Sequence, residues 1–134
     1  MHTKKSDKAH ISQIKTRADF VKIQSKGKKW VSHGLTIQTM PNEHGLTRVG
    51  FTVTKRVDKS AVNRNRMKRR LRAVAADVLS KGALTGHDYI LVGRAQTLKR
   101  PYGLLCKDLR WCLRKLDLAI SAPKELRDHA QENA

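Results

Sequence analysis

The sequence contains no long apolar run, only two cysteines and few acidic residues. Its longest apolar stretches, such as Tyr89 to Gly93, are far shorter than the roughly 18 residues that a membrane-spanning helix needs. No apolar stretch follows the basic residues at the start of the chain, so we expect no secretory signal. Cys106 and Cys112 lie six residues apart on a predicted helix, about 9 Å along its axis, which is too far for a mutual disulfide. These absences predict a soluble cytoplasmic protein with two reduced thiols in its core.

The sequence also lacks the residue patterns of the common catalytic and metal sites. It has no Cys-x-x-Cys pair, and its six histidines do not show the spacing of metal ligands. It has no nucleophile beside a base, no paired carboxylates and no glycine-rich phosphate loop. Asp58, Asp77 and Asp88 are scattered along the chain, which is typical of acids at helix caps and in loops. We therefore expect no catalytic residue, metal or cofactor in the protein itself, and any chemistry should reside in a partner.

Positive charge is abundant instead. The 134 residues include 29 Lys and Arg against 11 Asp and Glu, a net charge of +18, and 39% of the residues are apolar. This length and composition predict one domain with a modest core and a strongly basic surface. We expect a flexible basic arm at residues 1–14, a single α–β domain at residues 15–120 and a polar C-terminal tail at residues 121–134.

The first half of the domain reads as one helix and two strands. A short helix is expected from Thr16 to about Lys26, then a strand over residues 31–40, and a turn at residues 41–45 that should make a hairpin with the next strand. That strand, residues 47–57, alternates between two faces. Apolar residues from Val49 onward form the buried face. Gly50 and the threonines after it form the other, which is either the floor of a groove or a solvated surface.

The second half alternates between helices and a strand. Residues 60–81 have helical periodicity, with an apolar stripe that consists of Met67, Leu71, Val74 and Val78. The apolar run from Tyr89 predicts a strand that is buried on both faces. Pro101 then opens a last helix with a broad apolar face. The order of elements predicts an α+β fold with helices packed on one small sheet.

The helix at residues 60–81 begins in a strongly basic segment. Residues 55–72 include nine Lys or Arg and one Asp. On a helical projection Arg64, Lys68 and Arg72 follow one flank of the apolar stripe, and Arg66, Arg69 and Arg70 point outward. Like charges four residues apart destabilise a helix, so this segment predicts a polyanionic partner. A merely solvated face would mix both signs, and a membrane-binding helix would carry Trp, Phe and Leu on its apolar face.

The polyanion is more consistent with RNA than with DNA. The sequence shows no helix-turn-helix spacing, zinc finger or heptad zipper. A basic helix that sits between strands suits docking on structured RNA better than insertion into a DNA major groove. The charge also predicts that binding weakens steeply with salt.

Two segments resemble the protein subunit of bacterial ribonuclease P. Residues 61–72 (AVNRNRMKRRLR) resemble the signature helix of that family, and residues 48–56 (RVGFTVTKR) resemble its signature strand. Asp19-Phe20, Gly27, the strand that starts at Asp88 and the helix that starts at Tyr102 fall in register, so the resemblance covers about residues 14–118. It implies a two-layer α–β sandwich of order αβββαβα, with an uncommon left-handed βαβ crossover around the basic helix.

The resemblance also implies a function. The family's enzyme is a ribonucleoprotein endonuclease that removes the 5′ leader from precursor tRNA, and its RNA subunit performs the hydrolysis with Mg²⁺. The protein binds that RNA and the single-stranded leader, has no obligate protein partner, and is expected to be monomeric when free. Two alternatives stay open, a structural RNA-binding protein of ribosomal type and a DNA-binding regulator.

Site residues follow from the same resemblance. The residues expected to contact the RNA subunit are Arg64, Asn65, Arg66, Lys68, Arg69 and Arg72. Those expected at the leader cleft are Phe20, Gln24, Thr36, Gln38, Thr52, Lys55 and Arg56. Phe20 matches an aromatic residue that stacks on leader bases in the family, although it could also be a plain core residue. Gln24 and Gln38 stand where some members carry further aromatics, so hydrogen bonding would replace stacking there.

Overall fold

The computed structural model describes residues 11–43, 45–82 and 85–118. Its elements, in chain order, are β1 (Ile11–Gln13), α2 (Arg17–Lys26), β2 (Lys28–Val31), β3 (Leu35–Pro41), β4 (Thr47–Thr52), α3 (Ala61–Gly82), β5 (His87–Gly93), the 3-10 helix η1 (Ala95–Thr97) and α4 (Tyr102–Lys115). None of the helices in the described residues is long and apolar enough to cross a membrane. From α2 onward the order is αβββαβα, which confirms the α+β fold class.

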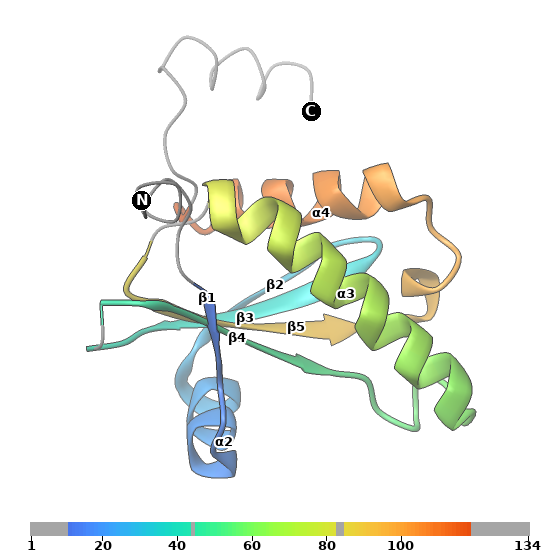
Figure 1. Ribbon diagram of the computed structural model, residues 1–134, viewed down its shortest axis with the longest axis horizontal. Coiled ribbons are helices and arrows are strands. Elements are labelled where there is room, and N and C mark those ends of the chain that lie inside the picture. Colours follow the sequence, from blue (N-terminus) through green and yellow to red (C-terminus); the bar gives the residue numbers. More distant parts are fainter. Residues whose placement is uncertain (1–10, 44, 83–84, 119–134) are drawn as a thin grey trace, which may run out of the picture.

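The described strands form one five-stranded sheet in the order β1-β4-β5-β3-β2. The β1, β4 and β5 strands are parallel, whereas β3 is antiparallel to both β5 and β2. Helices α3 and α4 lie side by side on one face of the sheet, and α2 lies on the other (Figure 1). In Figure 1, β4 runs in front of β5 with α3 above them, so the β4–α3–β5 crossover is left-handed, as the resemblance implies.

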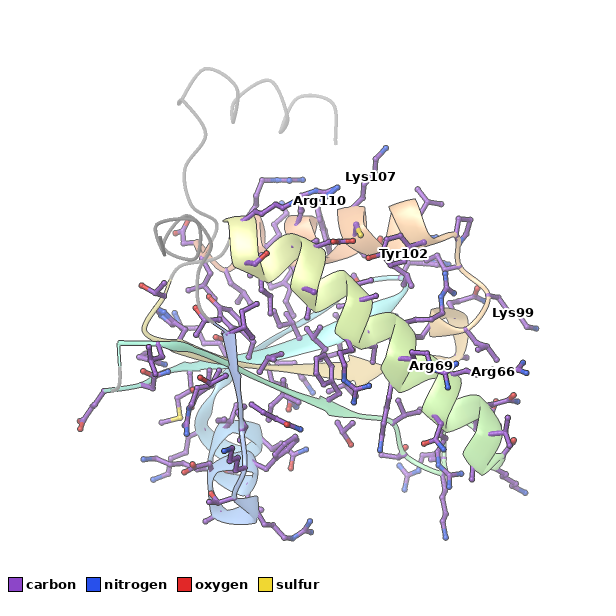
Figure 2. The ribbon with its side chains drawn as sticks, viewed as in Figure 1. Arg66, Arg69, Lys99, Tyr102, Lys107 and Arg110 are labelled. Carbon is purple, nitrogen blue, oxygen red and sulfur yellow. The ribbon has the colours of Figure 1, made fainter. Side chains whose placement is uncertain are left out.

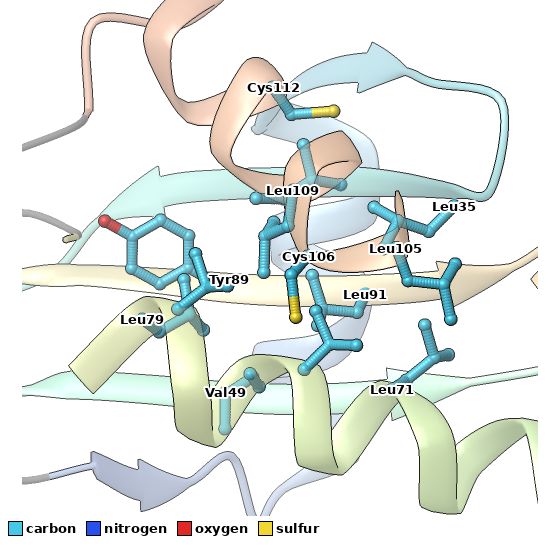
Figure 3. Packing of buried hydrophobic residues seen from close by; sticks show 14 of the residues in the cluster. Leu35, Val49, Leu71, Leu79, Tyr89, Leu91, Leu105, Cys106, Leu109 and Cys112 are labelled. Carbon is cyan, nitrogen blue, oxygen red and sulfur yellow. The ribbon is translucent and has the colours of Figure 1, made fainter. Parts of the chain in front are cut away.

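The larger hydrophobic core lies between the sheet and the α3–α4 layer (Figure 3). The predicted α3 stripe, Met67, Leu71, Val74 and Val78, is fully buried there. Helix α4 contributes leucines and both cysteines, and the sheet contributes side chains such as Tyr89 and Leu91. Cys106 and Cys112 are free and buried, as expected.

A smaller core lies under α2 on the opposite face. It consists of Ile14, Ile23 and Ile90, with Phe20 partly buried at its edge. Strand β5 therefore buries alternate side chains on both faces, Leu91 toward α3 and α4 and Ile90 toward α2. This double burial agrees with the continuous apolar run that the sequence shows at this strand.

The prediction of a hairpin between the strands at residues 31–40 and 47–57, which correspond to β3 and β4, is wrong. The turn after Pro41 does reverse the chain, but β3 and β4 are not neighbours, because β5 lies between them and pairs with both. The turn residues alone could not reveal this. The most apolar strand takes the centre of the sheet because only there are both of its faces covered.

The expected boundary of the N-terminal arm at residue 14 is also wrong. Ile11–Gln13 form β1, which pairs in parallel with Thr47, Arg48 and Val49 of β4. Ile14 follows and is 5% exposed in the α2-side core. A three-residue strand is too short for its alternation to stand out in a sequence. Residues 1–10 and 119–134, which include most of the expected arm and all of the expected tail, lie outside the described residues.

Candidate nucleic-acid interface

The start of α3 is fixed by polar residues of the preceding loop. The backbone N–H of Asn63 donates to Ser60 Oγ at 3.2 Å, and the backbone N–H of Ser60 donates to Asp58 Oδ1 at 2.9 Å. Asp58 Oδ2 also accepts from the side-chain amide of Asn63 at 3.2 Å. These bonds satisfy donors that a helix N-terminus leaves free, and the negative carboxylate interacts favourably with the positive end of the helix dipole. The prediction of a helix-cap or loop position is confirmed for Asp58, but it is wrong for Asp77, which lies within α3, and for Asp88, which is buried in β5.

Arg64 ties the same loop to the helix. Its Nη1 donates to the carbonyl oxygens of Asp58 and Lys59, both at 2.9 Å, and its side chain is half-buried. Arg64 is a predicted RNA contact. In the structure its side chain also holds the loop that leads into α3. A variant of Arg64 would therefore change both the loop and the charge.

Arg70 is not the outward-pointing cation that the helical projection predicted. Its Nη1 donates to the carbonyls of Thr97 and Leu98 at 2.7 and 2.8 Å, and its Nη2 donates to that of Arg100 at 2.6 Å. The side chain is half-buried and binds the turn between η1 and α4. A projection of one helix cannot show a loop 27 to 30 residues away, so sequence reasoning missed this role.

The remaining predicted α3 residues form its basic outer side. Asn65, Arg66, Arg69 and Arg72 are exposed, and Lys68 is half-buried. Figure 2 shows Arg66 and Arg69 on the outer side of α3. The Arg72 guanidinium lies 5.4 Å from the centre of the Phe51 ring, a cation–π contact that leaves its donors open to solvent. In the part of the chain that the structure describes, none of these cations forms an ion pair.

A groove opens on the other face of the sheet, between α2 and β4. Its volume is about 460 Å³, and its lining includes Phe20, Gln24 and Thr52 from the predicted cleft, together with Lys15 and Arg17, which sequence reasoning did not single out. Lys15 and Arg17 are exposed at the start of α2. Phe51 also lines the groove, which therefore combines two aromatic rings, polar groups and positive charge.

The floor beside this groove consists of short cross-strand rows. Strand pairing aligns Thr36 and Thr52 on either side of Val92, and Gln38 and Gly50 on either side of Ile90. The groove lining does not include Thr36 or Gln38. Gln38 is half-buried, and its Oε1 is shielded from solvent without a hydrogen-bond partner among the described residues. Gln24 is exposed at the groove, so the two glutamines differ in accessibility.

Gly50 determines how closely α2 approaches the sheet. A Cβ atom at this position would lie 2.6 Å from two ring carbons of Phe20, a distance that packed atoms do not tolerate. Phe20 is half-buried, with one side on Gly50 and the other in the groove lining. It is thus both a packing residue and a groove residue, which combines the two interpretations offered by the sequence.

A charged network beside the groove fixes α2 on the sheet. Arg48 Nε and Nη2 donate to the two carboxylate oxygens of Asp88 at 2.7 and 2.6 Å, and Arg48 Nη1 donates to Asp19 Oδ2 at 3.2 Å. Asn42 adds a bond of 2.8 Å to Asp88. The hydrogen bond to Asp88 raises the pKa of Arg48. Arg48 thereby connects β4, β5 and the first turn of α2. A basic residue on the small polar face of a strand was the available sequence signal for this link.

Lys55 and Arg56 lie between the two surfaces. Both are exposed in the loop that runs from Thr52, at the groove, to the start of α3. They therefore lie on the chain segment that connects the two predicted sites, although they do not line the groove itself.

The described residues contain no group of three or more His, Cys, Asp or Glu side chains that could hold a metal ion. Burial raises the pKa of the Cys112 thiol to about 11, which keeps it protonated at neutral pH. For binding, these surfaces offer guanidinium and ammonium groups and the rings of Phe20 and Phe51.

Comparison with known proteins identifies the family. The family model described as Ribonuclease P matches residues 9–117. The ribonuclease P protein component of Paramagnetospirillum magneticum is 42% identical over 113 residues, covering 81% of this chain and 84% of the relative. That of Gluconacetobacter diazotrophicus is 43% identical over 111 residues, covering 82% and 93%.

Solved structures agree with this assignment. A mutant of the Staphylococcus aureus RNase P protein, described as defective in mRNA degradation activity, superimposes with a TM-score of 0.67 at 26% identity, covering 79% of this chain and 88% of that one. The RNase P protein from Thermotoga maritima shares the fold, with a TM-score of 0.67 at 19% identity and coverage of 83% and 99%. With the signature strand and helix in register and nearly the whole described domain matched, the chain belongs to the ribonuclease P protein component family.

Proposed function

We propose that this chain is the protein component of a bacterial-type ribonuclease P and assists removal of the 5′ leader from precursor tRNA. In this proposal the exposed side of α3, with Asn65, Arg66, Arg69 and Arg72, binds the RNA subunit. Arg64 and Lys68 contribute from its flank. The single observation that carries the proposal is this row of cations without acidic partners among the described residues, on the helix that matches the family signature.

The groove at α2 is the proposed leader site. Its open shape suits a single strand of RNA, because Phe20 offers a ring on which an unpaired base can stack and the basic residues at the groove can contact phosphates. Lys55 and Arg56 extend positive charge from the groove toward α3. In this proposal Gln24, which is exposed at the groove, hydrogen-bonds a base, whereas Thr36 and Gln38 support the site from the strands beside the groove.

The hydrolysis itself is assigned to the partner RNA. The RNA subunit with Mg²⁺ supplies the chemistry in this proposal, and the protein supplies binding and orientation. Protein cations reduce the repulsion between two RNAs, so less Mg²⁺ is needed to bring enzyme and substrate together.

The test is cleavage of precursor tRNA at low Mg²⁺ by a bacterial ribonuclease P RNA, with and without the protein. We expect the wild-type protein to stimulate cleavage and the Arg66→Ala/Arg69→Ala variant to lose most of that effect. These two residues are chosen because they are exposed and unpaired within the described structure, whereas Arg64 also holds a loop.

The matched control is Lys22→Ala/Lys26→Ala, which removes the same charge from exposed positions on α2. It should stimulate cleavage like the wild type. Tight RNA binding without stimulation by the wild-type protein would instead favour a structural RNA-binding protein. A preference for duplex DNA would favour the regulator alternative.

A further inference from the structure

Helix α4 carries cations on its outer side that the α3 interface does not account for. Lys107 and Arg110 are exposed and three residues apart, so they share a face opposite the buried Leu105, Leu109 and Leu113. Arg114 lies in the last turn, where a positive charge interacts favourably with the helix dipole. Lys107 and Arg110 lie too far from that end to be explained in the same way.

Two acidic side chains near this side of α4, Asp108 and Asp77, already have hydrogen-bond partners. Asp108, between the two cations in sequence, is buried, and its carboxylate accepts from Arg100 Nε at 2.6 Å and Nη2 at 3.0 Å. The carboxylate of Asp77 on α3 accepts a hydrogen bond from the hydroxyl of Tyr102. Lys99, Lys107 and Arg110 form no ion pair within the described residues. A surface that only needs to be soluble would normally carry acids between such cations.

These cations are physically connected to the α3 interface. Arg70 of α3 binds the carbonyls on both sides of Lys99, and Arg100 then binds Asp108 of α4, next to Lys107. Two guanidinium clamps therefore fix the turn that carries Lys99 between the two helices. Figure 2 shows the sequence of exposed side chains, from Arg66 and Arg69 on α3 past Lys99 to Lys107 and Arg110 on α4.

We propose that Lys99, Lys107 and Arg110 form a second RNA-binding surface, the α4 surface, which contacts the sugar–phosphate backbone of a base-paired segment of the RNA subunit. This inference rests on the proposed function. The α4 surface lies on the sheet face opposite the leader groove and continues the α3 side, which favours the RNA subunit over the leader. Its cations are exposed on α4 and on the turn before it, which suits the phosphates of paired RNA better than unpaired bases.

The test compares two variants with equal loss of charge. Lys99→Gln/Lys107→Gln/Arg110→Gln removes the α4 surface, and Lys22→Gln/Lys26→Gln/Lys29→Gln removes three exposed cations elsewhere. Lys22 and Lys26 are on α2, and Lys29 alternates with Trp30, which packs on Trp111 of α4, so the control cations face away from α4. All six side chains are exposed, so both variants should fold.

The measurement is affinity for ribonuclease P RNA alone across a salt series. The slope of log affinity against log salt is negative, and each lost phosphate contact makes it less steep by about 0.7 to 0.9. The α4 variant should therefore have a slope about 2 to 3 closer to zero than the wild type, and the control should keep the wild-type slope. An unchanged slope in the α4 variant, beside lost binding in Arg66→Ala/Arg69→Ala, would overturn this inference alone.

Other outcomes are equally decisive. Equal losses in the α4 variant and the control would show a general charge effect and overturn the α4 surface. A defect seen only when precursor tRNA joins the assembled enzyme would place the contact on the substrate and overturn its assignment to the RNA subunit. Failure of the wild-type protein to bind the RNA subunit would overturn the proposed function, whatever the variants do.

Discussion

Neighbouring arginines on α3 have different surroundings and therefore different tasks. Arg69 is exposed, whereas Arg70 is half-buried and gives hydrogen bonds to three carbonyls of the turn before α4. A count of basic residues treats them as equal. The difference matters because loss of an exposed cation leaves nothing unpaired, whereas loss of Arg70 leaves carbonyl oxygens without donors.

This contrast yields a paired prediction. Arg70→Met should lower the free energy of unfolding by roughly 2–3 kcal/mol, because charged hydrogen bonds to partly buried carbonyls are lost. Arg69→Met should change it by less than about 0.5 kcal/mol and instead weaken binding to the RNA subunit. Urea denaturation and RNA titration of both variants check this. Equal stability of the two variants would contradict the structural role of Arg70.

At the scale of elements, the position of α2 depends on a few named contacts. Thr16 caps its first turn by accepting from the backbone N–H of Asp19 at 3.2 Å, and Asp19 then meets Arg48. Gly50 allows Phe20 to rest directly on the sheet. Because the groove lies between α2 and β4, these contacts determine its width as well as the stability of the helix.

Variants of this network should separate the two effects. Arg48→Met leaves the buried Asp88 without its ion-pair partner and should cost about 3–5 kcal/mol of stability. Asp19→Asn removes only the more exposed contact, at less than about 1 kcal/mol, but should increase amide hydrogen exchange across α2. Unchanged exchange in α2 would show that Asp19 does not hold this helix in place.

How far the sequence predicts each element depends on whether its signal is local. The α3 stripe and the alternation in β4 are local periodicities, and both were predicted correctly. The place of β5 between β3 and β4, the pairing of β1 and the carbonyls bound by Arg70 are contacts between distant segments, which no local pattern contains. The same limit applies to the site. Exposed cations such as Arg66 follow from helical spacing, but the structural roles of Arg64 and Arg70 do not.

At the scale of the whole molecule, the net charge of +18 opposes folding through self-repulsion and favours binding to a polyanion such as RNA. The described residues contain three ion pairs, and two of these involve Arg48. Most cations therefore repel one another in the free protein. Salt screens this repulsion, and it also weakens attraction to phosphates.

Added salt should thus stabilise the free protein but weaken its binding to RNA. Raising the salt from about 0.05 to 0.3 M should increase the Tm of the free protein by about 4 °C, since relief of self-repulsion by roughly 1 kcal/mol has that effect on a domain of this size. The same change should lower affinity for the RNA subunit by orders of magnitude. Scanning calorimetry and RNA titration in matched buffers measure both. A Tm that falls with added salt would contradict this account of the charge.

The position of β5 between β3 and β4 has a consequence for the order of events during synthesis. A nascent chain that ends before His87 has neither the central strand nor α4, so β3 and β4 each present an unpaired edge. The α3 helix, with its basic side, emerges from the ribosome before the strand that completes the sheet beneath it. Long-range pairing of this kind forms late, because loops of many residues must close first. The folded domain therefore cannot form until β5 and α4 have been synthesised, and a chain that ends before His87 is an aggregation hazard.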